Sequence, residues 1–253
     1  MKLWFKKVFS LLVADLTEYF RIPFIIISAA LTPVMMLLSF GFGSGGDMVM
    51  LNNHNYFNYI APGILAVGTM FSSTCAAGYT IIHDRQRKIL NDFILSPISY
   101  SSFVIARILG VIVKSGIPLI ITLVIGYILF DVSVVNVYWL ILAFTMSSIL
   151  YAGLGIILGT ISNVLAFEGF ANFFLIPSMY FGGVFFPITN YKEFGKLIYL
   201  LVPITSSVEM FRFGIAGYLT YGDISSHLAL LFVYDMIAIS LGVTIFKQSQ
   251  FGR

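Results

Sequence analysis

The residue types that most often perform catalysis are sparse in this sequence. The three histidines, His54, His83 and His227, are isolated from one another, which is not the spacing of a metal site. The sequence contains neither the G-x-x-x-x-G-K-[ST] phosphate loop nor the G-x-S-x-G motif of serine hydrolases. We therefore predict a chain with no catalytic, metal-binding or cofactor-binding residues of its own.

One short stretch formally fits a nucleotide-binding pattern. Residues 41–46, GFGSGG, match G-x-G-x-x-G, but that motif binds dinucleotides between a strand and a helix of a soluble βαβ unit. Here it follows a long apolar run, so we interpret it as a flexible loop. The acidic residues Asp84, Glu168 and Asp235 are scattered along the chain, which argues against the alternative of a membrane enzyme acting on lipids.

Two charged residues, Lys114 and Asp235, lie inside long apolar runs. Ionisable side chains at membrane depth are costly, and they usually face the interior of a helix bundle and pair with one another. We hypothesise that Asp235 faces such an interior and pairs with a cation such as Lys114. In the alternatives, Lys114 reaches the membrane surface along its aliphatic stem, and Asp235 lies beside a water-filled path or a subunit contact.

Composition identifies the elements that must hold these residues. Of the 253 residues, 59% are hydrophobic and 10% are charged, and the mean hydropathy is +0.97, whereas soluble proteins carry about 25% charged residues. No basic stripe indicates a nucleic-acid surface. We predict an all-α polytopic membrane protein, a single transmembrane domain over 1–253 with six spans of roughly 20 residues. The expected spans are about 22–42, 57–82, 102–130, 137–160, 166–186 and 227–246.

The first 21 residues differ in pattern from the spans. Lysines at positions 2, 6 and 7 precede a run that Asp15, Glu18 and Arg21 interrupt, so no compact apolar core leads to a cleavage site. Apolar and polar residues instead take mostly opposite faces of a helix. We expect an amphipathic helix over 1–21 that lies along the membrane interface, and no cleavable signal peptide.

A glycine pair lies in the fourth expected span. Gly155 and Gly159 form a G-x-x-x-G pattern, which allows two helices to approach closely. We interpret the pair as packing within the subunit rather than as a contact between subunits.

A short charged segment separates the second and third spans. In residues 84–98, DRQRKILNDFILSPI, the apolar residues recur at helical spacing and charged residues take most of the other face. We interpret the segment as a short amphipathic helix just outside the bilayer, placed to receive force from a soluble partner. The alternative is an ordinary cytosolic loop whose charges only fix the topology.

The apolar part of the stretch between the fifth and sixth spans is too short to cross the membrane. Residues 188–216 contain an apolar piece that is short and interrupted by Pro203. We predict a re-entrant hairpin on the outer side, which enters the membrane and returns to the same face. Lys and Arg residues concentrate in the N-terminal helix, the 83–107 connection and the tail. By the positive-inside rule both termini should lie in the cytoplasm of a multi-pass cell-membrane protein.

The order of these parts resembles the permease subunit of a type-2 ABC exporter, a family that exports drugs, lipo-oligosaccharides or polysaccharides. Three stretches carry the similarity: NYIAPGILA at 58–66, DRQRKILNDFILSPIS at 84–99, and 176–188 followed by 202–212. Residues 84–99 resemble the coupling helix of the family. They depart from its usual Gly, Thr and Glu at Lys88, Ile89 and Asn91.

The resemblance implies a function and partners. It implies a permease that forms a substrate path as a dimer, with a second copy or a paralogue, among membrane lipids. ATP and Mg would be bound by separate cytosolic ATPase subunits, which contact the 84–98 helix. The residues that match the family's coupling motif are Arg85, Arg87, Leu90, Ser96 and Pro97. Those of the implied outer hairpin are Pro187, Pro203, Glu209 and Arg212.

A different class of transporter remains as an alternative. An ion- or proton-coupled secondary transporter would use Lys114 and Asp235 as a charge relay. We see no internal repeat in the sequence, although many secondary transporters are built from repeats with broken helices at matching positions. Dependence on a proton gradient rather than on ATP would distinguish the two transporters.

Overall fold

The computed structural model describes residues 2–43, 49–50, 54–87, 100–187 and 202–251. These ranges form a helical bundle with one two-residue antiparallel strand pair. The elements are α1 Lys2–Phe20, α2 Pro23–Gly43, β1 Val49–Met50, β2 His54–Asn55, α3 Tyr56–Gln86, α5 Tyr100–Phe130, α6 Val137–Ile161, α7 Val164–Phe181, α9 Pro203–Ala216 and α10 Ile224–Phe251.

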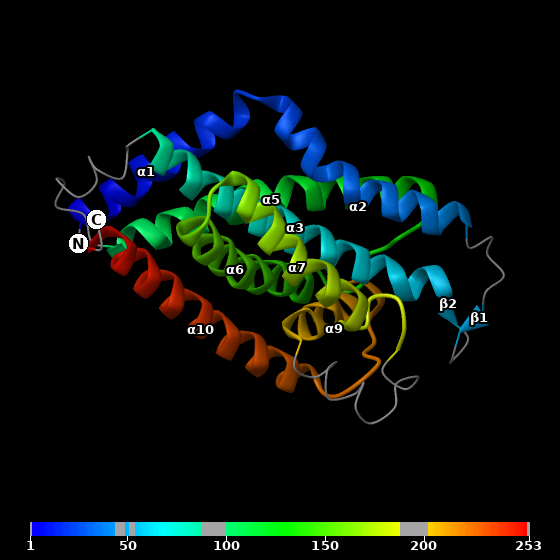
Figure 1. Ribbon diagram of the computed structural model, residues 1–253. Helices are drawn as coiled ribbons and strands as arrows, with labels where there is room; N and C mark the ends of the chain where they lie inside the picture. The colour runs from blue at the N-terminus through cyan, green and yellow to red at the C-terminus, as the bar shows by residue number, and fades with distance from the viewer. Residues whose placement is uncertain (1, 44–48, 51–53, 88–99, 188–201, 252–253) are drawn as a thin grey trace.

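Six of these helices, α2, α3, α5, α6, α7 and α10, are long and apolar enough to cross a membrane. Their bounds agree with the six expected spans to within a few residues, so the predicted all-α polytopic fold is confirmed. Both chain ends lie at the same end of the bundle, opposite the β1–β2 pair (Figure 1).

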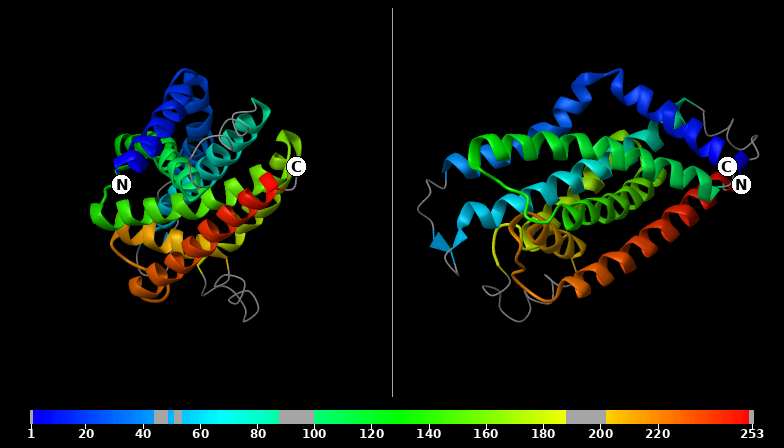
Figure 2. Two further views of the ribbon diagram at one scale, coloured as in Figure 1. Left: turned by 90° about the vertical axis from the view of Figure 1, so that its left-hand side faces the viewer. Right: turned by 180° about the vertical axis from the view of Figure 1, so that it is seen from behind.

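Helix α3 is the centre of the bundle, and most of its residues are buried. It packs on α5, α6 and α9. Helices α1 and α2 lie on one side of the bundle and α10 lies on the opposite side, as the three views agree (Figure 1, Figure 2). The large apolar residues of α3, such as Ile60, Ile64 and Met70, are fully enclosed. The central helix therefore contacts α5 and α9, two of the helices that contribute to the sites below.

The contact between α3 and α6 depends on glycine. A Cβ at Gly159 would lie 2.7 Å from the carbonyl oxygen of Gly78, and one at Gly155 would lie 2.8 Å from the Cβ of Ala77. Both distances are too short for a real side chain. The G-x-x-x-G pair thus brings two helices of one subunit together, as the sequence predicted.

The buried stripe of α1 contains both apolar and polar residues. Val8, Asp15 and Tyr19 are buried on this helix, which packs on α5, whereas Phe9 and Phe20 are more than half exposed. In a membrane-embedded bundle, lipid can cover exposed apolar side chains, whereas a carboxylate needs a cation in the protein interior. The inward face of α1 is therefore partly polar.

Candidate functional site

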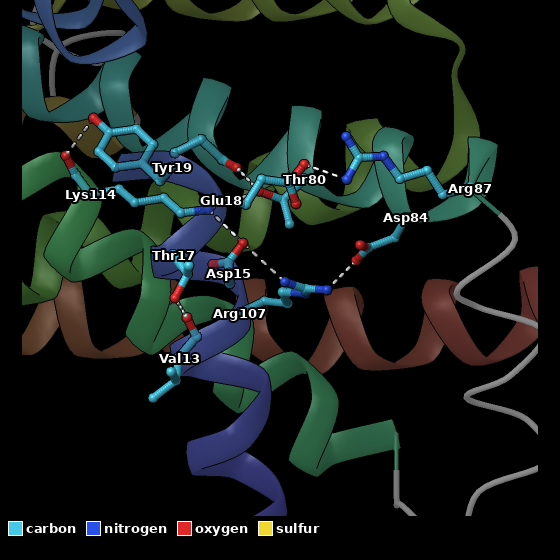
Figure 3. Close-up of polar contacts among 11 residues, drawn as sticks. Val13, Asp15, Thr17, Glu18, Tyr19, Thr80, Asp84, Arg87, Arg107 and Lys114 are labelled. Atoms are coloured by element: carbon cyan, nitrogen blue, oxygen red, sulfur yellow. Dashed lines mark hydrogen bonds and ion pairs between the residues drawn. The ribbon is translucent and has the colours of Figure 1, made fainter. Parts of the chain in front are cut away.

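Asp15 of α1 lies at the centre of a buried ionic network. Its Oδ1 accepts a hydrogen bond from Nζ of Lys114 at 2.7 Å, and it lies 3.0 Å from Nη1 of Arg107 (Figure 3). Arg107 also forms an ion pair with Asp84 through Nη2. The four side chains are 5 to 8% exposed. The network joins the N-terminal helix to α3 and α5.

The spacing of α5 explains why two cations meet one carboxylate. Arg107 and Lys114 are seven residues apart, about two helical turns, so they share one face. Gly110 lies between them, and a Cβ there would collide with Oδ2 of Asp15. Because Gly110 has no side chain, the carboxylate of Asp15 can lie between the two cations.

Burial makes this network sensitive to the loss of any member. Charges that leave water lose their hydration, and opposite charges close by must replace it. Within the described residues, Oδ2 of Asp15 and Nε of Arg107 have no hydrogen-bond partner. If one member of the network is removed, few other groups are therefore placed to compensate the charge of its partner.

A second, more exposed pair extends the network toward the end of α3. Arg87 forms an ion pair with Glu18, and both side chains are about half exposed (54% and 48%). Its backbone N–H donates to the carbonyl of His83 at 2.9 Å, so it continues the last turn of α3. The pair ties the start of the charged segment to α1.

Tyr19 completes the contact between α1 and α5. Its hydroxyl donates to the backbone carbonyl of Lys114 at 3.3 Å, and the ammonium of Lys114 also donates to the hydroxyl of Thr80 at 3.1 Å. Burial raises the pKa of Tyr19 above its ordinary value, so this phenol stays protonated and remains a donor at neutral pH.

Arg85 ties the other side of the α3 terminus to the connection between α6 and α7. Its guanidinium donates to the carbonyl of Thr160 at 2.9 Å and to the carbonyl of Ser162. These carbonyls belong to the end of α6, where helical acceptors lack intrahelical donors. Arg85 in the last turn of α3 and Arg87 just after this helix thus hold two different elements.

The segment 84–98 is described only at its start. The predicted amphipathic helix begins at residue 84, but Asp84 lies inside the last turns of α3 and binds Arg107. A buried carboxylate needs a cation nearby, which accounts for the place of Asp84 within the bundle. Leu90, Ser96 and Pro97 lie outside the described residues.

The hypothesised pair of Lys114 and Asp235 is not formed. Lys114 binds Asp15 instead. Asp235 of α10 does face the bundle interior at 3% exposure, and its Oδ1 has no hydrogen-bond partner among the described residues. The cost of a charge at membrane depth favoured an inward Asp235, but it carried no information on which helices are neighbours.

The far end of the bundle holds a second buried pair. Glu209 and Arg212 of α9 are fully buried, with Nη1 of Arg212 2.6 Å from Oε1 of Glu209. Arg212 also donates to the carbonyl of Gly183 at 3.2 Å and lies over the ring of Tyr59 at 4.1 Å. The remaining carboxylate oxygen of Glu209 accepts from the backbone N–H of Thr220 at 2.9 Å.

This cluster joins α9 to α3 and to the turn after α7. Of the residues predicted for the outer hairpin, it brings Glu209 and Arg212 together. Pro203 instead starts α9 at its first turn, where its missing N–H is tolerated, and Pro187 lies in the turn after α7. Residues 188–201 are outside the described ranges, so the re-entrant path stays a prediction.

Two comparisons with known proteins bear on this geometry. A protein-family model described as "ABC-2 type transporter" matches residues 6–216. That range includes the ionic network, the charged segment and the buried pair of α9. A search of curated proteins found no match.

Proposed function

The chain belongs to the ABC-2 type transporter family, and from that premise we propose that it is the permease subunit of an ATP-driven exporter. Family membership and six apolar helices make it a multi-pass membrane transporter subunit. The proposal adds that the subunit works as a dimer, that separate cytosolic ATPase subunits supply the energy, and that residues 84–98 form the contact between the two.

The observation that carries the coupling proposal is the attachment of the α3 terminus. Arg85 binds the end of α6, and Arg87 binds Glu18 of α1. The segment that would contact the ATPase therefore starts from a point fixed to two other helices. Movement of this segment would be transmitted to both, because ion pairs and hydrogen bonds resist separation of the elements they join.

The buried network would carry the movement further. Asp84 lies one position before Arg85 and binds Arg107, which also binds Asp15. A shift at the α3 terminus would thus act on α5 as well as on α1. For ATP to drive transport, its binding must favour one of two permease arrangements through different contacts in each.

The dimer and the orientation have separate support. Helices α2 and α7 are among the least buried of the candidate spans, so they offer surface for a second subunit. The bundle places both termini at one end, next to the α3 terminus (Figure 1). With the basic residues at that end, the positive-inside rule assigns it to the cytoplasm.

The test is charge reversal at the α3 terminus of a complex of the chain with its ATPase. In Arg85→Glu/Arg87→Glu, we expect membrane insertion to persist and coupled ATP hydrolysis to fall to the rate of the free ATPase. The matched control is Arg21→Glu/Lys247→Glu, which reverses two exposed cations outside the network. Wild-type ATPase coupling in the first variant would contradict the proposal.

A further inference from the structure

A cavity of about 600 Å³ lies between α1, α2 and α3. Lys114 of α5 closes part of its wall. Pockets of 300–1,000 Å³ are the usual size for drug-sized ligands.

The cavity has two chemically different ends. The ion pairs described above line it where the end of α1 meets the last turns of α3, at positions 15–19 and 79–87. Helix α2 and the middle of α3 supply an apolar wall that includes Ile25, Val67 and Phe71. A molecule that fills both ends must therefore be amphipathic, with one polar and one apolar part.

The charges at the polar end are already matched. Each charged side chain of the lining belongs to an ion pair: Asp15 with Lys114, Glu18 with Arg87, and Asp84 with Arg107. A ligand head with net charge would have to separate one of these pairs or bring an uncompensated charge into a sheltered site, and both are costly. A neutral head avoids either cost.

Hydrogen-bonding capacity remains for such a neutral head. The Lys114 ammonium has three N–H donors, and two of them are used by Asp15 and Thr80. The aromatic rings of Tyr19 and Tyr79 also line the cavity. Among the described residues the third donor has no hydrogen-bond acceptor, so a ligand hydroxyl can accept from it. The apolar faces of a sugar ring can pack on the aromatic rings.

We propose that this cavity binds an amphiphile with an uncharged, hydroxyl-rich head and an apolar tail. This binding does not depend on the proposed exporter function. A cationic head is the nearest competitor, because Glu168 accepts a hydrogen bond from Tyr79 at 2.9 Å and makes no ion pair within the described residues.

The chain contains a native reporter for the cavity. Cys75 is its single cysteine and lies on the cavity wall. We would place the purified full-length protein in lipid nanodiscs and measure the rate at which N-ethylmaleimide modifies Cys75. The probes share an eight-carbon tail and are used below the concentration at which they aggregate: octyl glucoside, octyl sulfate and octyltrimethylammonium. Glucose tests the head alone.

We expect octyl glucoside to slow the modification about threefold at twice its dissociation constant, because bound probe shields the thiol by mass action. Glucose and the two charged amphiphiles should leave the rate nearly unchanged. Equal protection by all three amphiphiles would overturn the neutral-head assignment and indicate a plain acyl-chain site. Protection only by octyltrimethylammonium would overturn it in favour of a cationic class.

Cavity-filling variants locate the effect. Ala29→Phe and Ser28→Phe place a ring at two lining positions of α2, whereas Ile27→Phe changes an exposed, non-lining neighbour. Protection should be lost in whichever filling variant purifies as folded protein and kept in Ile27→Phe. Protection that persists in the filled cavity would contradict the proposal. Capture of an ATPase is measured separately, so failure here leaves the exporter proposal standing.

Discussion

Asp15 and Lys114 are 99 positions apart in the chain, and their side chains meet at 2.7 Å in the interior of the bundle. The contact fixes the N-terminal helix to α5, and both residues are among the few charged groups that are almost fully buried. Because the same carboxylate also faces Arg107, one aspartate is shared between two cations, and Asp84 supplies the second negative charge.

Asp15→Asn should destabilise the protein by about 3–5 kcal/mol, because two buried cations lose a shared counter-charge. Unfolding of the purified protein in detergent, followed by circular dichroism, measures the loss. Replacing the cation as well, in Asp15→Asn/Lys114→Met, should cost less than the sum of the two single variants. Glu18→Gln, at a half-exposed pair, should cost about 1 kcal/mol or less. Equal losses for the Asp15 and Glu18 variants would refute the buried network.

Gly110→Ala should destabilise the protein by about 1–3 kcal/mol through overpacking, because its Cβ would collide with Asp15. The cost should shrink when Asp15 is also replaced by alanine. Gly43→Ala is the matched control, since a Cβ there has no atom within 4 Å. An unchanged midpoint of thermal unfolding in Gly110→Ala would show that the carboxylate does not occupy this position.

Gly159→Ala should loosen the contact between α3 and α6 and lower stability by a similar amount, about 1–3 kcal/mol. Gly169→Ala is the control, because nothing lies within 4 Å of a Cβ there. At that open helical position alanine should be neutral or stabilise the helix by about 0.5–1 kcal/mol. The midpoint of thermal unfolding should be lower for Gly159→Ala than for Gly169→Ala. The opposite order would contradict the close approach of α3 and α6.

Arg212→Lys should lower the free energy of unfolding by more than an exchange between two cations usually does. Lysine keeps the charge but lacks the planar fork that reaches Glu209 and the carbonyl of Gly183 together. We expect a loss of about 3 kcal/mol or more, because a buried carboxylate keeps only part of its partner. Arg21→Lys, at an exposed site, controls for the substitution. Matching thermal midpoints for the two variants would mean that the α9 pair adds nothing to the fold.

The six spans were predictable because a membrane helix needs about 20 apolar residues, and hydropathy records this need directly. The role of Asp15 was not predictable in the same way. Hydropathy places an aspartate on the polar face of an amphipathic helix, and only the neighbouring helix shows that this face turns inward.

The network had one sequence signal that could have revealed it. Arg107 and Lys114 are seven residues apart on an otherwise apolar helix, which puts two cations on one face. Their partners come from α1 and α3, and spacing within one helix cannot identify partners on another. Glu209 and Arg212 are adjacent on α9 by their i, i+3 spacing, but their complete burial depends on α3 and on the turn after α7.

The most direct test of the exporter account is capture of an ATPase. The tagged chain would be co-expressed with P-loop ATPases that lack membrane spans, purified in detergent, and compared with Leu90→Glu and the Arg21→Glu/Lys247→Glu control. The account predicts that the intact chain and the control retain an ATPase and that Leu90→Glu loses it. A folded intact chain that retains no ATPase, while its transport depends on a proton gradient, would contradict the account.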